Sequence, residues 1–390
     1  MEKRKITFSP PDITEREIAE VVDTLRSGWI TTGPKTKKFE DEIAKYCGTK
    51  KAVALNSATA AMELALRLFD IGEGDEVITS AYTYSASASV IYHCGAKIIL
   101  ADTKKGEFNI DPKEIEKLIT PRTKAIIPVD IAGLPADYAE IFEVVEKKRN
   151  IFNAKKGTYQ EKLGRILVLA DSAHSFGSDY KGKKIGSVAD ITSFSFHAIK
   201  NLTTAEGGAL TWNLPENFDN EEIYKELMLL ALHGQNKDAL AKLKAGAWKY
   251  DIVMPGYKCN MTDIMASIGL VQLQRYDGEI LKKKEELVSY YEKYLGDLTD
   301  KIELPIFKND IKESCKHLYM IRLKNQDEEK RNEIIAKLGE NDIATNVHFQ
   351  PLPLLTAYKK LGFKIEDYPN AYNQYKNEIS LPIHDFLTED

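Results

Sequence analysis

One segment of the chain combines residues that could bind an anion. Small and hydroxyl-bearing residues fill positions 56–59, between an apolar run that ends at Leu55 and a helical pattern that follows. The start of a helix presents unpaired N–H groups and the positive end of the helix dipole. A phosphate could therefore bind to the backbone of Ala58 and Thr59 and to the hydroxyl of Thr59. Taken alone, the same pattern also fits an ordinary helix cap.

Two further segments supply a carboxylate and an amine. Asp171 stands at the carboxyl end of the apolar run 165–170, which is where ligands bind to open α/β sheets, although such a residue can also cap the next helix. His174 follows it and is typical of a hydrogen-bonding histidine. Lys200 lies in 193–210, a segment poor in charge. A desolvated lysine has a lowered pKa and can form a Schiff base, whereas a surface loop would leave it an ordinary lysine.

The three segments follow one another in an order that suits a single cofactor. Pyridoxal phosphate needs an anion site, a carboxylate that keeps its pyridine nitrogen protonated and a lysine for its aldehyde. Thr59, Asp171 and Lys200 could supply these in turn. Each signal is weak by itself, and their combination indicates a pyridoxal-phosphate site.

The elements that must position these residues follow a clear pattern. Between about residues 36 and 213, helical patterns alternate with short runs rich in Val, Ile and Leu. Continuous apolar runs of this kind are typical of strands buried on both faces of a mostly parallel sheet, which predicts a three-layer α/β unit. The expected strands lie within 51–56, 75–80, 96–101, 123–129, 165–171, 190–196 and 207–212.

The rest of the chain predicts a second, smaller unit. A helical period runs through 262–298 from a Thr-Asp pair suited to capping, and should link the two units. After it we expect a strand over 317–323, a helix over about 327–339 and a strand over 343–349, in an α+β domain that ends near 380–383. The expected division is a large cofactor-binding domain over 1–260 and the linking helix with the small domain over 261–390.

Composition excludes several classes of protein. The 390 residues include 54 Lys+Arg, 59 Asp+Glu and 43% apolar residues, which excludes a disordered chain and a membrane-spanning one. A net charge of −5 provides no basic field for nucleic acid or an anionic membrane. No secretory signal is visible at the start, so we expect a cytoplasmic protein. The 4 Cys are widely spaced, which argues against disulfides and zinc and favours buried thiols, and no metal site is expected.

Two polar stretches are expected to lie on the surface. Segment 146–165 is mostly charged and reads as a solvated insertion. Three lysines at 282–284, followed by two glutamates, have the spacing of a solvated helix face.

The chain resembles the sugar aminotransferases of the DegT/DnrJ/EryC1/StrS family over nearly its whole length. The resemblance is carried by Gly33-Pro34 with Phe39-Glu40 and by the segments 56–66, 74–88, 169–178, 193–210, 232–234, 255–273 and 380–383, of which the Lys200 segment is the most specific. It implies the aspartate aminotransferase (type I) fold, with a mostly parallel central sheet in a three-layer large domain and a smaller C-terminal α+β domain. The context of 256–260 is closest to the branch acting at C4 of nucleotide-linked sugars, such as the UDP-4-amino-4-deoxyarabinose aminotransferases.

The resemblance also implies a role for each matching residue. Lys200 matches the lysine that holds the cofactor and moves the proton, and Asp171 matches the carboxylate at the pyridine nitrogen. Tyr84 matches an aromatic ring against the cofactor face, and His174 the residue beside the phenolic oxygen. The phosphate ligands match Ala58, Thr59 and Ser195.

Two more positions imply a partner subunit. Lys258 and Asn260 stand where the family has the Asn and Arg of a Gly-Tyr-Asn-Tyr-Arg turn, which reaches the phosphate of the second subunit. The implied assembly is a homodimer with shared active sites, in which either of the two could cross the interface. Near the C-terminus, the segment 348–355 resembles the family's His-Tyr-x-Pro segment, but Pro353 stands where a second histidine is common, so the resemblance does not imply the sugar contact of that histidine.

The expected activity follows from this match. Related dehydratases carry histidine at the position of Lys200, so a lysine there favours transamination. The expected amino donor is glutamate, which leaves pyridoxamine 5'-phosphate. The expected acceptor is C4 of a UDP-linked keto-deoxysugar, for surface polysaccharide or glycan biosynthesis. A C3-keto, dTDP-linked acceptor stays open, as do a pyridoxal-phosphate lyase acting on amino acids and a non-catalytic protein that binds nucleotide sugars. A nicotinamide enzyme would need a Gly-x-Gly-x-x-Gly motif after the first strand, where 56–61 stands instead.

Overall fold

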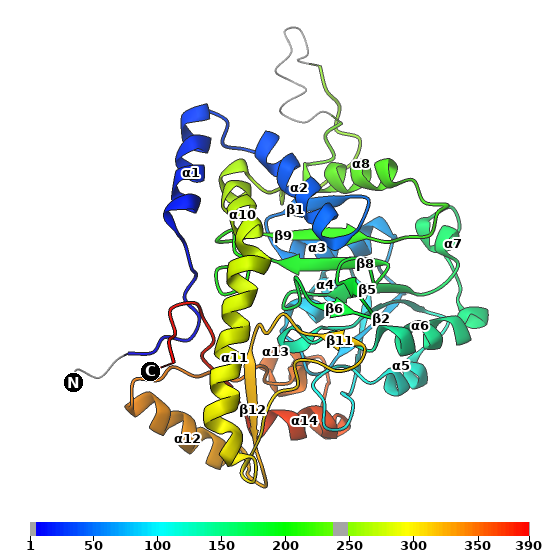
Figure 1. Cartoon of the computed structure of the whole chain (residues 1–390). Coiled ribbons are helices and arrows are strands. Elements are labelled where there is room, and N and C mark those ends of the chain that lie inside the picture. Colours follow the sequence, from blue (N-terminus) through cyan, green and yellow to red (C-terminus); the bar gives the residue numbers. More distant parts are fainter. Residues whose placement is uncertain (1–4, 237–248, 390) are drawn as a thin grey trace.

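The computed structural model describes residues 5–236 and 249–389 and is built around a seven-stranded sheet with the order β1-β9-β8-β5-β4-β2-β3 (Figure 1). Its strands are β1 (Ala52–Leu55), β2 (Glu76–Ser80), β3 (Lys97–Ala101), β4 (Thr123–Ile127), β5 (Leu167–Asp171), β8 (Ile191–Ser195) and β9 (Gly208–Trp212). Strands β8, β5, β4, β2 and β3 pair in parallel, and β9 is antiparallel to both neighbours. Every residue of β1, β2, β4, β5 and β9 is buried. All seven predicted strands of the mostly parallel sheet are confirmed.

Helices cover both faces of this sheet, so the three predicted layers are confirmed. One apolar cluster packs α3 (Ala58–Leu68), α4 (Ala86–His93) and α8 (Asn220–Ala231) against the sheet. A second cluster packs α2 (Pro34–Cys47), α5 (Pro112–Leu118) and α6 (Tyr138–Lys147) against the other face. Strand β1 shows the alternation, because Val53 and Leu55 belong to the first cluster and Ala52 and Ala54 to the second.

The predicted long helical segment is confirmed, but it is not one uniform helix. It consists of α10 (Asp263–Arg275), a π-helical stretch (Tyr276–Leu281), α11 (Lys282–Leu295) and a 3-10 turn (Gly296–Leu298) (Figure 1). Thr262 caps it by accepting from the backbone N–H of Met265. The expectation of a solvated lysine face is wrong for Lys284, which is buried and donates to the backbone carbonyl of Ile383 at 2.6 Å. Packing of α11 on the C-terminal segment encloses this side chain.

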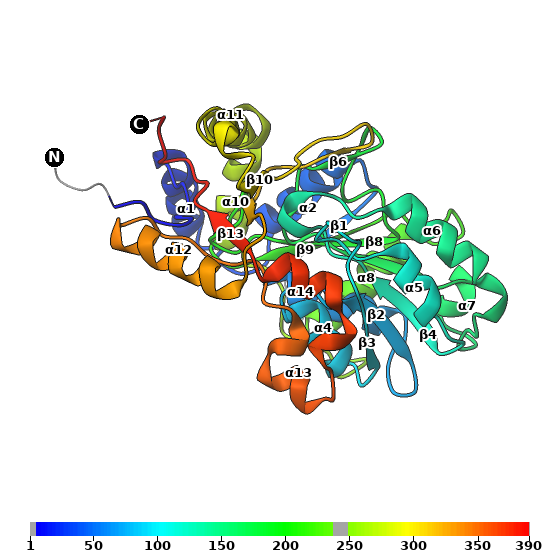
Figure 2. The same ribbon diagram turned by 90° about the horizontal axis from the view of Figure 1, so that it is seen from below.

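The smaller domain is built on a three-stranded antiparallel sheet of β10 (Ile302–Glu303), β12 (Tyr319–Leu323) and β13 (Glu378–Leu381). Helix α12 (Glu328–Glu340) contacts β13 of this sheet, whereas α13 (Thr356–Lys360) and α14 (Pro369–Tyr375) pack beside the large unit, where α4 and β3 lie (Figure 2). The strand predicted over 343–349 is wrong: this segment forms only isolated bridges, from Ile343 to Ile6 and from Asn346 to Ser380. The division of domains at residue 260 stays a prediction.

Other predicted features have mixed outcomes. Segment 146–165 contains a 3-10 turn (Arg149–Ile151) and α7 (Tyr159–Leu163). It is not wholly solvated, because Gln160 is buried and donates to the carbonyl of Phe69 at 2.9 Å. All four cysteines are free and buried, as predicted. Within residues 5–236 and 249–389, no helix is long and apolar enough to cross a membrane, and no group of His, Cys, Asp or Glu side chains could hold a metal ion.

A two-stranded hairpin joins the two parts of the molecule. Strands β6 (Asp179–Tyr180) and β7 (Lys183–Lys184) follow β5, and β6 pairs with β11 (Lys312–Glu313) of the later chain.

Helix α1 (Glu15–Ser27) packs along α10, so the N-terminal segment lies beside the linking helices (Figure 1).

Candidate active site

Most of the predicted site residues line one cavity of about 520 Å³. They come from the start of α3, the start of α4 and the carboxyl ends of β5 and β8, where parallel strands of an α/β sheet place their ligands. The cavity volume lies in the usual range for a pocket that holds a small molecule. The predicted residues that line it are Ala58, Thr59, Tyr84, Asp171, His174, Ser195 and Lys200.

The start of α3 forms a cradle at one end of the cavity. Ser57 is the N-cap and accepts from the backbone N–H of Ala60 at 3.1 Å, and the N–H groups of Ala58 and Thr59, at the start of the helix, have no intrahelical partner. Gly208 of β9 lies against this turn: a Cβ there would stand 2.3 Å from the Ser57 carbonyl carbon and 2.4 Å from the Ala58 nitrogen. Ser195 is the register partner of Gly208 on β8. Backbone N–H groups and hydroxyls therefore gather where a phosphate would fit.

Asp171 ends strand β5 and is 5% exposed. Ser87, on α4, donates its hydroxyl to Asp171 Oδ2 at 2.7 Å, and the backbone N–H of Ala173 donates to Oδ1 at 3.3 Å. Burial raises the pKa of Asp171, and these two hydrogen bonds and the charge of Lys200 act against that rise. A buried carboxylate held in this way suits a cationic N–H partner. The sequence does not predict the role of Ser87, because Ser87 and Asp171 are 84 positions apart in the chain.

Lys200 lies in the turn between β8 and β9, where its backbone N–H donates to the His197 carbonyl at 2.9 Å. Burial of the amine in the cavity lowers the pKa of Lys200 to about 8, although the charge of Asp171 raises it. Much of the amine is therefore uncharged near pH 8, as an attacking amine or general base requires.

His174 is buried beside the same cavity. Its Nδ1 accepts from the backbone N–H of Ala132 at 3.3 Å, and its ring stacks on Phe349 with centroids 5.6 Å apart. Burial lowers the pKa of His174 well below its ordinary value, so the ring is neutral. With Nδ1 accepting, its proton sits on Nε2, which can donate to an oxygen in the cavity. Tyr84, at the rim, is 66% exposed, and its ring centroid lies 5.9 Å from that of Phe349.

Lys258 and Asn260 do not line this cavity. Lys258 is exposed and forms a bridge with Leu232, and Asn260 forms a bridge with Leu55 at the end of β1. Lys258 Nζ donates to Asn260, which donates to the Thr32 hydroxyl at 2.5 Å. Their predicted role at the site of a second subunit stays a prediction.

Further residues line the cavity besides the predicted ones. Phe8 and Ser9 of the N-terminal segment do so, together with His317, Leu318 and the segment 346–349. The family resemblance of 348–355 marks His348 and Phe349, but no local pattern marks Phe8, Ser9 or His317, because they belong to irregular chain that lies far in sequence from β5 and β8. A wall of this composition offers both apolar surface and imidazole groups to a ligand.

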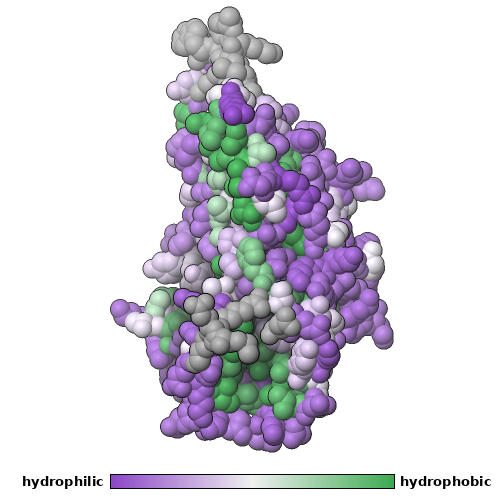
Figure 3. Space-filling model, turned by 60° about the vertical axis from the view of Figure 1, so that its left-hand side comes forward, coloured by the Kyte–Doolittle hydropathy of each residue, from purple (hydrophilic) through white to green (hydrophobic). Residues whose placement is uncertain are grey.

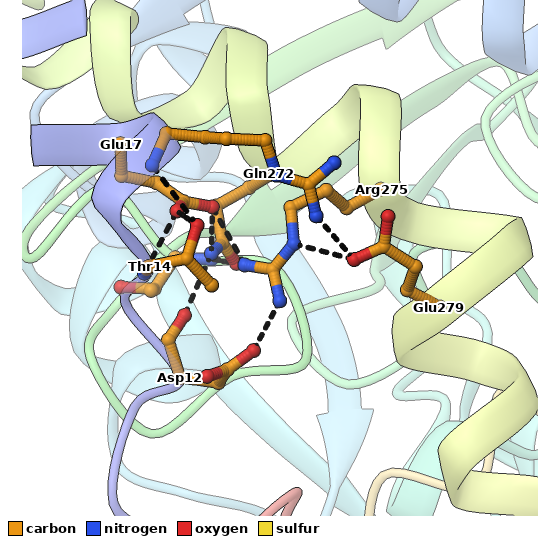
Figure 4. A network of polar contacts seen from close by, with 8 residues as sticks. Asp12, Thr14, Glu17, Gln272, Arg275 and Glu279 are labelled. Atoms are coloured by element: carbon orange, nitrogen blue, oxygen red, sulfur yellow. Dashed lines mark hydrogen bonds and ion pairs between the residues drawn. The ribbon is translucent and has the colours of Figure 1, made fainter. Parts of the chain in front are cut away.

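A buried ionic network anchors the N-terminal segment (Figure 4). Arg275, at the end of α10, donates to Glu17 Oε1 at 2.7 Å and also pairs with Asp12. Gln272 donates to Glu17 Oε1 and to the backbone carbonyl of Asp12, both at 2.9 Å. Burial alone would raise the pKa of Glu17, but hydrogen bonds from Thr14 and Arg275 lower it. The network holds the start of α1 and the segment before it against α10.

The donor set fits pyridoxal phosphate. The open first turn of α3, which Gly208 approaches so closely that a Cβ would meet its backbone, suits the phosphate, and the buried carboxylate of Asp171 suits a protonated pyridine nitrogen. Lys200 supplies an amine of lowered pKa in the same cavity. These are the groups that the cofactor requires of its protein.

Comparisons with known proteins identify the family of this chain. The DegT/DnrJ/EryC1/StrS aminotransferase family model matches residues 11–390. The spore coat polysaccharide biosynthesis protein SpsC of Bacillus subtilis is 40% identical over 392 residues, which cover 99% of this chain and 94% of SpsC.

Solved structures extend the comparison to the fold. Spr1654 of Streptococcus pneumoniae, assigned as a sugar aminotransferase, superposes in its PMP form with a TM-score of 0.95 at 54% identity, covering 98% of this chain and 95% of that one. Its PLP form gives a TM-score of 0.94 at 52% identity, covering 99% and 95%. Helicobacter pylori PseC, an aminotransferase involved in the biosynthesis of pseudoaminic acid, gives 0.84 at 29% identity, covering 99% and 95%. The chain belongs to the DegT/DnrJ/EryC1/StrS aminotransferase family: it has the type I fold and is a transaminase whose cofactor is pyridoxal phosphate.

Proposed function

We propose that this enzyme transfers an amino group from glutamate to C4 of a UDP-linked keto-deoxysugar in the biosynthesis of a surface polysaccharide or glycan. One observation carries the proposal: Lys200, Asp171 and the phosphate cradle meet in a single cavity with further walls free for a sugar. SpsC and PseC, by their descriptions, act in polysaccharide and sugar biosynthesis. The preference for C4 and UDP rests on the resemblance of 256–260 to that branch of the family.

The roles of the chain's own residues follow from the geometry. When bound, pyridoxal phosphate supplies an electron sink for the carbon that bears the amino group and carries that group between two substrates. Asp171, buried and held by Ser87, would pair with the pyridine N–H and keep it protonated. Lys200 Nζ is uncharged in large part near pH 8. It would take the proton from the substrate carbon that bears the amino group and return it to the aldehyde carbon of the cofactor.

Neighbouring groups would orient the ring. Nε2 of the neutral His174 would donate to the phenolic oxygen, and Tyr84 would pack against the ring face. The first-turn N–H groups of α3, with the hydroxyls of Thr59 and Ser195, would bind the phosphate.

Borohydride trapping tests the assignment of Lys200. The protein loaded with pyridoxal phosphate is reduced, digested and mapped by mass spectrometry. We expect the label on Lys200 and its loss in Lys200→Ala, with Lys282→Ala, an exposed lysine of α11, as the matched control. A label on another lysine in the wild-type protein would contradict the assignment.

The substrate is tested with glutamate and a panel of UDP- and dTDP-linked 3-keto and 4-keto sugars, with products identified by mass spectrometry. We expect the amine at C4 of a UDP-linked sugar. Amination of a dTDP-linked 3-keto sugar instead would favour the alternative acceptor. Release of pyruvate or a thiol from a sulfur amino acid, with no amino transfer, would favour a lyase.

We also propose a homodimer with shared active sites. One face of the molecule exposes apolar side chains along α1 and near the 256–260 turn, a feature typical of protein interfaces (Figure 3). These side chains are Ile18 at 47%, Leu25 at 53%, Ile30 at 49%, Ile252 at 48% and Val253 at 54% exposure. The outward position of Lys258 on this turn supports its reaching a partner's phosphate.

Mixing two inactive variants tests the shared site. Lys258→Ala combined with Asn260→Ala in one protein, and Lys200→Ala in another, should each be nearly inactive. If sites are shared, a heterodimer has one site with both defects and one with neither, so mixing should recover activity. A mixture that stays inactive although native mass spectrometry shows subunit exchange would mean that each subunit builds its own site.

A further inference from the structure

Three buried side chains form a hydrogen-bonded chain that ends in the cavity. His348, which lines the cavity, has its Nδ1 2.9 Å from the hydroxyl oxygen of Ser380. The same hydroxyl oxygen lies 2.6 Å from Glu378 Oε1, and Glu378 Oε2 accepts the backbone N–H of His348 at 2.9 Å. Strand β13 presents Glu378 and Ser380 on one face, because they are two positions apart. The three side chains are 7%, 0% and 0% exposed for His348, Ser380 and Glu378.

This chain leaves one ring nitrogen of His348 for a ligand. The ring of His348 stacks on Phe8, with centroids 5.5 Å apart and planes 22° apart. This stacking and the hydrogen bond with Ser380 together fix the orientation of the ring. Since Nδ1 is taken by Ser380, Nε2 is the nitrogen that can bind a molecule in the cavity.

The position of His348 favours a contact with the sugar. Its wall also contains Phe8 and Phe349, and none of these three residues belongs to the groups assigned to the cofactor. Burial and the charge of Lys200 together lower the pKa of His348 to about 4, so the ring is neutral and lies near the reacting amine. The ligand class that fits a neutral imidazole here is an oxygen of the acceptor sugar.

We propose that His348 Nε2 donates a hydrogen bond to an oxygen of the acceptor sugar, and that Glu378, acting through Ser380, is the positioning residue whose proton selects the donating form. This inference rests on the proposed function, because it assumes that a sugar occupies this wall.

The protons can be followed atom by atom. When Glu378 is protonated on Oε1, it donates to Ser380, which donates to His348 Nδ1, so the ring proton sits on Nε2 and can be donated to the sugar. When the carboxyl loses its proton, Ser380 donates to the carboxylate instead, and Nδ1 carries the ring proton and donates to Ser380. Nε2 then has only a lone pair. The ring is neutral in both forms, and the trio differs by one proton.

The surroundings of Glu378 bring the pKa of its carboxyl, and with it the change of the His348 tautomer, near neutral pH. Burial raises the pKa of Glu378 to about 8, while the guanidinium of Arg331 on α12 acts against the rise. Arg331 also donates to the Glu378 backbone carbonyl at 3.3 Å. On β12, Arg322 is the register partner of Glu378, and its side chain pairs with Glu303 at 2.9 Å. The Tyr82 hydroxyl donates to the His348 carbonyl at 2.5 Å, and its own pKa is raised well above 10 by burial.

A substitution and a pH series test the relay. With the midpoint near 8, the donating form falls about tenfold between pH 7 and pH 9, so the KM for the sugar should rise about tenfold. In Glu378→Gln, the side-chain amide donates to Ser380 at every pH, so this rise should disappear. The KM for glutamate should be the same in both proteins. Glu40→Gln is the matched control, because Glu40 is a buried glutamate with a pKa raised by burial to about 7 that contacts Ala54 and Tyr224 instead.

A second readout needs no activity. In wild-type protein loaded with cofactor and labelled with 15N-histidine, NMR should show His348 changing from the Nε2–H to the Nδ1–H tautomer between pH 7 and pH 9. The signal is assigned by its absence in His348→Asn. A single tautomer throughout, or a flat KM for the sugar in an enzyme that does transfer amino groups to sugars, would overturn the relay. A tautomer change without any sugar amination would overturn the proposed substrate and leave the relay standing.

Discussion

Replacing Arg275 with methionine should detach the N-terminal segment from the linking helices. The Arg275 side chain is 5% exposed and pairs with Glu17, whose side chain is 1% exposed. Methionine fills similar apolar space but provides no charge, so the variant leaves a buried carboxylate without its cation. Thr14 and Gln272 still donate to Glu17, which keeps part of its stabilisation.

The magnitude follows from the burial of this pair. Breaking a buried ion pair by removing one partner costs about 3–5 kcal/mol, and the remaining donors place this case near the lower end. At 1.4 kcal/mol per factor of ten, about 3 kcal/mol raises the opening equilibrium of α1 roughly a hundredfold. The effect should depend on pH in a defined direction. The lowered pKa of Glu17 means that its stabilisation is present above the ordinary carboxyl pKa and is lost as the pH falls through the folded value. In the variant Arg275 no longer contributes to this lowering, so its Glu17 takes up a proton at higher pH than in the wild type, and the difference in stability should narrow as the pH falls through the two folded pKa values.

Amide hydrogen exchange over 15–27 measures this opening directly, with peptides of α12 as an internal reference. Arg16→Met is the matched control, because Arg16 also pairs with Glu279 but through side chains that are 56% and 47% exposed, where a pair contributes about 1 kcal/mol or less. Adding Glu17→Gln to Arg275→Met should restore part of the protection. Equal exchange in Arg275→Met and Arg16→Met would refute the reasoning.

Three further outcomes are expected at the cofactor site. Asp171→Asn should retain cofactor but lower the transamination rate by roughly a hundredfold or more, and near-normal turnover would make Asp171 a structural cap only. Gly208→Ala should weaken cofactor binding by at least roughly tenfold in titrations, because its Cβ would meet backbone at 2.3 Å, whereas Gly278→Ala, with nothing within 4 Å, should not. The rate at which added pyridoxal phosphate becomes attached, followed by absorbance, should rise with pH up to about 8, where Lys200 loses its proton. In Asp171→Asn that midpoint should move to lower pH, because the charge of Asp171 raises the pKa of Lys200.

Most of the residues that the sequence places at the proposed cofactor site line one cavity, and they could be found because their signals are local. Apolar runs of Val, Ile and Leu mark central strands wherever both faces are buried, and β5 follows that rule from Leu167 onward. Asp171 and Ser195 then stand at strand ends, and the cap residue before α3 marks its open turn. What the sequence does not reveal is Ser87, because a hydroxyl that orients a carboxylate from another element has no pattern of its own.

Non-local contacts explain the errors. Residues 343–349 have the composition of a strand, but their backbone bonds are divided: Ala344 pairs with Ile6, and Asn346 pairs with Ser380. Two partners on different segments leave no continuous ladder, so no strand forms. Lys284 is a similar case. It has the spacing of a solvated lysine, and only the C-terminal segment, which provides the carbonyl of Ile383, makes its position buried.

The two halves of the cavity therefore differ in how they are built. The proposed cofactor half lies at the ends of regular elements, whereas the proposed substrate wall combines irregular chain around Phe8 with the segment 346–349. These two stretches depend on each other, since Phe8 stacks on His348 and the residues just before them pair through Ile6 and Ile343. Each also depends on a buried acid, Glu17 for the N-terminal segment and Glu378 for His348. In irregular segments that are held by a few buried charges, side chains can be substituted without disturbing a strand or a helix. Selection for a new sugar can therefore act on this wall while Lys200 and Asp171 stay in place, which is how one fold can serve many acceptors with one cofactor chemistry.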